Sequence, residues 1–183
     1  MPVSSSRSPA SAARRSAEVV MGLTLPPLLE TLLNDLGFTW PEVDETELAS
    51  LAATWMSFGS TLSSAAQGAQ GAARDLAAAN SGEAMDAFLR AWSGPRAPAA
   101  TMENAAVGVD AGAAAILVCA GITLALKVNT IINLTILVAE IAEAVATSVP
   151  TFGASLLEIP VFKELASRII GLLVNEAVNA IMA

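Results

Sequence analysis

Between positions 44 and 80 the chain carries apolar residues at alternating steps of three and four. They are Leu48, Leu51, Trp55, Phe58, Leu62, Ala65, Ala69, Ala72 and Leu76. This spacing predicts a long amphipathic helix whose apolar seam lies along a partner helix. At ~1.5 Å per residue the helix would be about 55 Å long. The helix cannot bury such a seam by itself, so the rest of the chain is expected to cover it.

A shorter helix is predicted before it, beginning at Leu25 and ending at Gly37, because two prolines suit its first turn and leucines line one face. An acidic cluster at positions 42–47 follows. Asp44 and Glu47 have the spacing of a capping box. We interpret the cluster as a helix cap whose carboxylates stay in water.

A tight turn at Asn80, Ser81 and Gly82 is predicted to end the long helix. Residues 83–92 form a return helix with Phe88 and Trp92 on its apolar face. We expect Trp55 and Phe58 to be core anchors that face this pair. The predicted hairpin seam is therefore Leu48, Leu51, Trp55, Phe58, Leu62, Leu76, Phe88 and Trp92.

Two uncharged runs, 111–126 and 128–139, flank Lys127. The first has 16 residues, short of the ~20 that a bilayer-spanning helix needs. If the runs are a soluble core, we expect two helices that turn near Lys127 and leave its ammonium in water, because an unpaired buried charge is costly. The alternative is a hairpin that enters a membrane. The residues that decide between them are Ile116, Leu117, Lys127, Ile131 and Leu137.

A final helix is predicted from Pro160 to the end, and no alternating strand pattern occurs in the sequence. The predicted fold class is all-α, an elongated antiparallel helical bundle built on a helical hairpin. Residues 21–183 form one domain, with the hairpin at about 44–127 and C-terminal helices at about 128–183. Residues 1–20 are rich in Ser, Ala, Arg and Pro and are expected to be a disordered tail. Met21 is an alternative start of the chain.

The composition argues against most site chemistry. The chain has no His, one Cys and no Tyr, so a nucleophile lacks its usual base and a zinc or haem site cannot be assembled. A net charge of −8 disfavours nucleic acid, which needs a basic surface. We expect no enzyme activity, no cofactor and no metal. The tail has no apolar core of a secretory signal.

The layout of a long helix, a turn ending in glycine and a return helix resembles the WXG hairpin of type VII secretion substrates. The stretches FTWPEVDE and SGEAMDAF are similar to the WXG-like N-terminal domain of actinobacterial polymorphic toxins, including the mycobacterial channel-and-necrotizing-toxin type. The resemblance extends over about residues 21–183. The turn motif of that family falls on Asn80, Ser81 and Gly82, of which the glycine matches.

The resemblance implies a non-enzymatic interaction module for type VII (ESX-type) secretion. Its partner would be a helical protein or a second copy, together with secretion machinery, and the protein would be cytoplasmic before export and then secreted or on the cell surface. The family's export signal contains a Tyr, so here a partner supplies it or the protein is retained. Alternatives are a membrane-active or pore-forming protein that inserts residues 105–147, and a structural oligomer.

Overall fold

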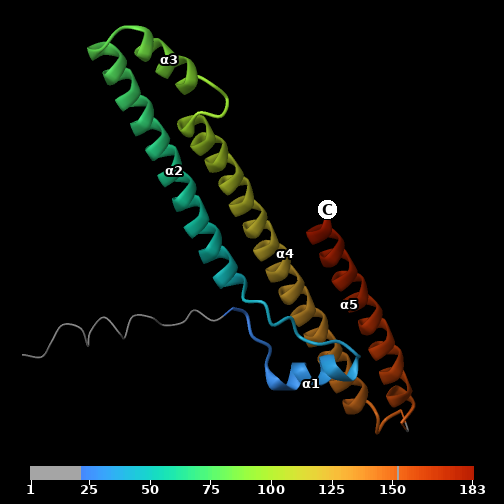
Figure 1. The fold of residues 1–183 in the computed structure, drawn as a ribbon. Coiled ribbons are helices and arrows are strands. Elements are labelled where there is room, and N and C mark those ends of the chain that lie inside the picture. The colour runs from blue at the N-terminus through green and yellow to red at the C-terminus, as the bar shows by residue number, and fades with distance from the viewer. Residues whose placement is uncertain (1–21, 152) are drawn as a thin grey trace, which may run out of the picture.

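The computed structural model describes residues 22–151 and 153–183 (Figure 1). In order they form α1 (Pro27–Asp35), α2 (Glu45–Ala79), α3 (Glu83–Trp92), α4 (Pro98–Ala146), the 3-10 helix η3 (Ala154–Glu158) and α5 (Ile159–Met182). No strand occurs in the described ranges. The all-α prediction is confirmed. The expected disordered tail, 1–20, and Met21 lie outside the described residues.

Two long antiparallel helices, α2 and α4, make the body of the molecule, and α5 lies alongside the second half of α4 (Figure 1). The short helix α1 lies against α4 near the base, and α3 caps the opposite end. The base is the best-packed part, where Leu33 of α1, Leu134 of α4 and Ile170 of α5 are at most 1 % exposed. Phe38 and Trp40 from the α1–α2 connection pack against this cluster.

Small side chains form the contact between α2 and α4. The buried positions recur every seven residues on both helices: Glu45, Ala52, Gly59, Ala66 and Ala73 on α2, and Ala99, Ala106, Ala113, Ala120 and Lys127 on α4. A seven-residue repeat is the period at which two helices stay in contact along a left-handed supercoil. A side chain at Gly59 would collide with the carboxylate of Asp110. Alanine and glycine therefore let the two backbones approach closely.

The expected break near Lys127 is wrong, because α4 continues as one helix from Pro98 to Ala146. The second helix of the hairpin therefore ends at Ala146 and not at the expected position 127. The expectation assumed that the Lys127 ammonium must reach water. It does not, since Glu45 at the start of α2 meets it inside the bundle.

The seam between α2 and α4 gives the first testable prediction. Ala66 is fully buried against α4, whereas its neighbour Ala65 is exposed. Ala66→Leu should lower the unfolding free energy by about 1–3 kcal/mol, because extra methylenes in a close-packed contact force the backbones apart. Ala65→Leu is the matched control and should stay within about 0.5 kcal/mol of the parent. Denaturant unfolding followed by circular dichroism measures both, and equal effects would contradict the close-packed seam.

Candidate interaction surface and buried ion pair

The large apolar residues of α2 do not occupy the contact with α4. Leu51, Trp55 and Phe58 are 44 %, 42 % and 53 % exposed, and Leu76 is 45 % exposed. Leu48 and Leu62 are half-buried. The three-four spacing thus identified a real apolar face, but the face is turned aside from the seam. We call Leu48, Leu51, Trp55, Phe58 and Leu62 the apolar strip.

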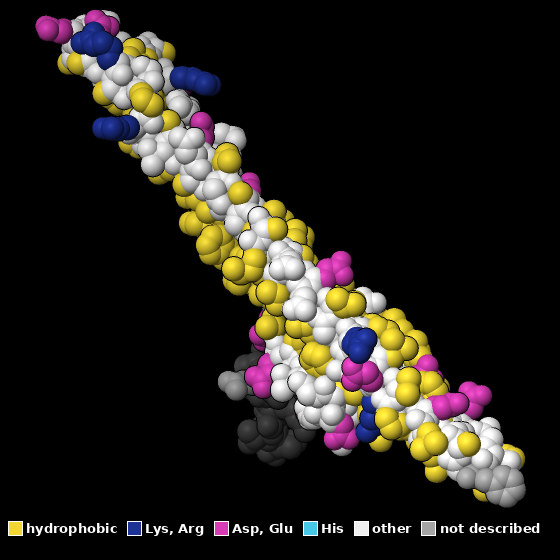
Figure 2. Space-filling view, turned by 90° about the vertical axis from the view of Figure 1, so that its right-hand side faces the viewer, with side chains coloured by type: hydrophobic (Ala, Val, Ile, Leu, Met, Phe, Trp, Pro, Cys, Tyr) yellow, Lys and Arg dark blue, Asp and Glu magenta, His cyan; other side chains and the backbone are white. Residues whose placement is uncertain are grey.

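Trp55 shows how the strip is built. A methyl group on Gly112 of α4 would lie 3.7 Å from the Trp55 ring. The ring therefore lies over the α4 backbone beside the seam and presents its other side to solvent. Figure 2 shows hydrophobic side chains exposed along much of the molecule. A long uncharged surface of this kind fits a protein partner better than a small polar ligand.

The expected packing of Trp55 and Phe58 against the return helix is wrong. Phe88 and Trp92 stack on each other with centroids 5.5 Å apart. The Trp92 indole N–H donates to Oε1 of Gln70 at 3.0 Å. Gln70 is about 22 Å along the helix from Trp55 at ~1.5 Å per residue, so the return helix is too short to reach the strip.

The turn is built on Gly82. Asn80 ends α2 and its side-chain amide donates to the Leu76 carbonyl at 2.9 Å. Gly82 immediately precedes α3 and has a φ of 108°. Residues with a Cβ rarely adopt this backbone conformation. Neither Asn80 nor Ser81 caps α3 with its side chain, because Gly82 occupies the N-cap position.

A buried ion pair joins the start of α2 to the middle of α4. The Lys127 ammonium donates to Oε2 of Glu45 and to the carbonyl of Val43, both at 2.7 Å. Its Nζ lies 5.6 Å from the centre of the Trp40 ring, within cation–π range. The two charged residues are 2 % and 6 % exposed. The prediction that the acidic cluster stays in water is therefore wrong for Glu45.

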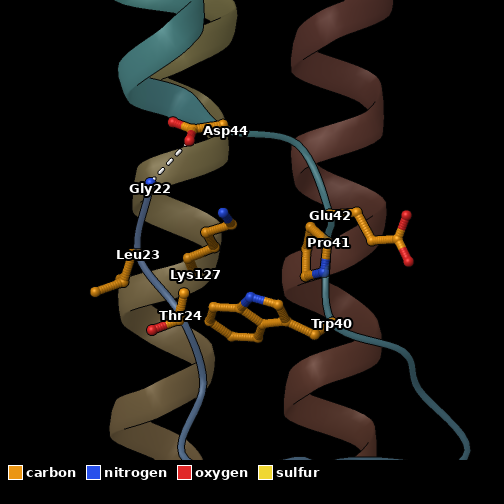
Figure 3. Close-up of a pocket in the computed structure, with 8 residues that line it drawn as sticks. All are labelled: Gly22, Leu23, Thr24, Trp40, Pro41, Glu42, Asp44 and Lys127. Atoms are coloured by element: carbon orange, nitrogen blue, oxygen red, sulfur yellow. Dashed lines mark hydrogen bonds between the residues drawn. The ribbon is translucent and has the colours of Figure 1, made fainter. Parts of the chain in front are cut away.

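The N-terminal segment of the described chain passes beside Lys127 at residues 22–24 (Figure 3). The Gly22 amide donates to Oδ2 of Asp44 at 2.9 Å, and the Leu23 amide donates to Glu45. A methyl at Gly22 would lie 2.8 Å from the Asp44 carboxylate. The absence of a side chain at Gly22 therefore allows the backbone to come this close to Asp44. A cavity of about 260 Å³ lies between this segment, Trp40 and Lys127.

The two carboxylates are held in their charged forms. The Gly22 amide and the Glu47 amide lower the pKa of Asp44, which also caps α2 by accepting from the Thr46 amide at 2.8 Å. This confirms Asp44 as the cap, but among the described residues no hydrogen bond joins the Asp44 amide to the Glu47 carboxylate, so the predicted capping box is only half formed. Burial by itself raises the pKa of Glu45, but the hydrogen bonds from Lys127 and Leu23 outweigh it and the pKa lies below its ordinary value.

The residues of the two uncharged runs are divided among several environments. Leu137 is buried, Ile116 and Ile131 are half-buried and Leu117 is 47 % exposed. By length and composition, α4 and the segment Ala154–Met182 are each able to cross a membrane. Only 17 % and 11 % of their most apolar windows are buried. The bundle thus leaves much of both helices uncovered.

Sequence analysis missed the seam and the partner of Lys127. The sequence does contain a pattern that marks the seam, because small residues recur every seven positions from Ala52 to Ala73 and from Ala99 to Ala120. Alanine and glycine carry little weight in a hydrophobicity pattern, so the larger side chains beside them dominated it. Among the described residues there is no group of three His, Cys, Asp or Glu that could hold a metal.

Removing one member of the buried pair should be far more damaging than removing an exposed one. Lys127→Met leaves the Glu45 carboxylate buried without its cation and should cost about 3–5 kcal/mol. Lys163 is the control, since it is 40 % exposed and 3.9 Å from Asp35. Lys163→Met should cost at most about 1 kcal/mol. Urea titration measures the unfolding free energy of both variants. Equal losses of unfolding free energy in Lys127→Met and Lys163→Met would contradict a buried pair.

The lowered pKa of Glu45 also predicts how stability depends on pH. The unfolded carboxyl titrates near 4.5 and the folded one below it, so below that pH the unfolded state binds more protons. Stability should therefore be constant above this value and fall as the pH drops through the folded pKa. In Glu45→Gln the fall should be shallower, while Asp44 contributes equally to both proteins. Thermal midpoints between pH 7 and pH 3 test this, and parallel curves would contradict it.

Comparisons with known proteins agree with this architecture. A family model for the WXG100-like domain matches residues 26–169, which includes α1 to α4 and the beginning of α5. A search of curated proteins and a search of solved structures found no significant match. WXG100-like domains are associated with type VII secretion substrates and are in general non-enzymatic helical proteins. The match spans most of the chain, which therefore belongs to the family of WXG100-like domains.

Proposed function

We propose that this protein is a non-enzymatic helical interaction module that targets cargo to type VII secretion. The observation that carries the proposal is the apolar strip, in which two aromatic residues, Trp55 and Phe58, are about half exposed on a well-defined helix. Trp is one of the side chains enriched at the energetic centres of protein interfaces. The strip contains no charged residue.

The partner we propose is a second helical hairpin, contributed by another protein or by a second copy. Members of the family typically form hairpin dimers and associate with secretion machinery. A helix laid along the strip would convert the two-helix part of the molecule into a larger bundle and bury the exposed leucines and aromatics. Since the chain has no Tyr, we propose that this partner supplies the Tyr-containing export signal.

The similarity to actinobacterial polymorphic toxins supports a narrower proposal about cargo. FTWPEVDE includes Trp40 and Asp44, which help to build the surroundings of Lys127, and SGEAMDAF includes the turn glycine Gly82. These stretches therefore fall at the two ends of the hairpin. We propose that the module belongs to a secreted toxin system, and that it is cytoplasmic before export and then secreted or on the cell surface.

Export gives the test. The tagged chain should reach the culture medium of a host with an active type VII system and should stay in cells that lack the channel of that system. Trp55→Ser should reduce the exported amount, because loss of an interface Trp costs about 2 kcal/mol or more, roughly a thirtyfold loss of affinity. The control is Val149→Ser, at a residue that is 83 % exposed outside the strip.

Two outcomes would contradict the proposal. One is export that does not depend on the secretion channel. The other is equal export of Trp55→Ser and Val149→Ser with unchanged helical circular dichroism. The first would remove type VII secretion from the proposed function, and the second would remove the apolar strip from recognition.

A second candidate function is membrane activity, favoured by the two long apolar helices that are mostly uncovered. Insertion of 105–147 would have to separate Lys127 from Glu45, or carry both into the bilayer, which is costly. Exposed Ile132 and Ile136 offer a test that does not touch the core. Flotation with liposomes that Ile136→Asp abolishes, with the helical signal intact, would favour this candidate over the first.

A further inference from the structure

The seam between α2 and α4 does not fix its own alignment. A methyl on Gly59 would lie against Asp110 and Val109, so in an antiparallel pair Ala66 lies at about the level of residue 103, between Ala99 and Ala106. A shift by seven residues in one direction would place Ala66 between Ala106 and Ala113 instead. Each of these positions is a buried alanine. Packing of small residues alone would therefore be nearly equivalent in these two alignments.

The segment between the two helices does not remove this ambiguity. Residues 80–97 join α2 to α4, and α3 within them buries none of its residues. Its contact with α2 includes the single hydrogen bond between Trp92 and Gln70. Because this connection is weakly packed, it can change its conformation when one helix is displaced along the other.

One interaction in the seam distinguishes the alignments. Among the described residues, the buried charged side chains are Glu45 and Lys127, and they meet at 2.7 Å. A shift of seven residues moves each by about 10.5 Å at ~1.5 Å per residue, which leaves both charges buried without a partner. A buried polar group that specifies register is the best-supported role for such groups in helical coils.

We propose that the Glu45–Lys127 ion pair sets the register of the α2–α4 hairpin. Its surroundings tie that register to the base of the domain. The Leu23 amide holds the Glu45 carboxylate, and the Val43 carbonyl and the Trp40 ring hold the ammonium. The pair thereby decides which residues of α4 lie beside Trp55, and so the shape of the apolar strip.

Disulfide trapping tests the register in the whole chain, with Cys119→Ser to remove the native thiol. Three proteins carry cysteines at Ala66 and at Ala106, Ala99 or Ala113. In the parent the 66–99 and 66–106 pairs flank the level of Ala66 and serve as references. The 66–113 pair should stay open there, because residue 113 lies about 15 Å along α4 from that level at ~1.5 Å per residue, and a disulfide requires Cα atoms within about 7 Å. In Glu45→Gln/Lys127→Met, the 66–113 pair should rise at least about tenfold in yield, which corresponds to a register preference of about 1.4 kcal/mol.

A matched control removes an exposed pair. Arg168 and Glu164, 74 % and 66 % exposed and 3.0 Å apart, are replaced in Glu164→Gln/Arg168→Met, which should leave the 66–113 pair open as in the parent. Removing both members of the buried pair, rather than one, avoids an unpaired charge and favours folding. The proposal is overturned if the variant that lacks both Glu45 and Lys127 keeps its helical signal and still leaves the 66–113 pair open. It is equally overturned if that variant unfolds, because the pair would then be needed for folding rather than for register.

Discussion

The constraint on which the rest of the structure depends is the close approach of α2 and α4. Alanine and glycine at every seventh position allow two long helices to lie backbone against backbone. Such a contact buries little apolar area for each residue and discriminates poorly between alignments. The buried pair of Glu45 and Lys127 supplies what the small residues lack, a directional interaction that is satisfied in one arrangement.

This division of roles explains where the large side chains are. Because the seam is filled by small residues, Leu51, Trp55 and Phe58 are displaced to its flank and remain available to another molecule. The base is organised differently, with Leu33, Leu134 and Ile170 forming an ordinary core beneath the connection that carries Trp40. One end of the protein is therefore a packed domain and the other is a two-helix arm (Figure 1). The apolar side of that arm is exposed.

The arm and the base meet at the ion pair. Asp44 and Glu45 each have two functions there, since they begin α2 and also bind the amides of Gly22 and Leu23. The Gly22 amide lowers the pKa of Asp44, and the hydrogen bonds from Lys127 and the Leu23 amide lower the pKa of Glu45. For a protein proposed to present a helical surface to a secretion partner, this junction orients the arm relative to the base.

The sequence by itself determined the all-α class, the helices at 45–79 and 83–92, the Asp44 cap and the glycine turn, because these depend on local spacing and local hydrogen bonds. The family resemblance likewise followed from residues that are adjacent along the chain. Tertiary structure alone decided which face of α2 is buried and that α4 passes Lys127 without a break. Helical periodicity shows that a face is apolar but not which of two neighbouring faces a partner helix covers. A buried lysine is acceptable only when its counterion is present, and Glu45 is 82 residues away in the chain.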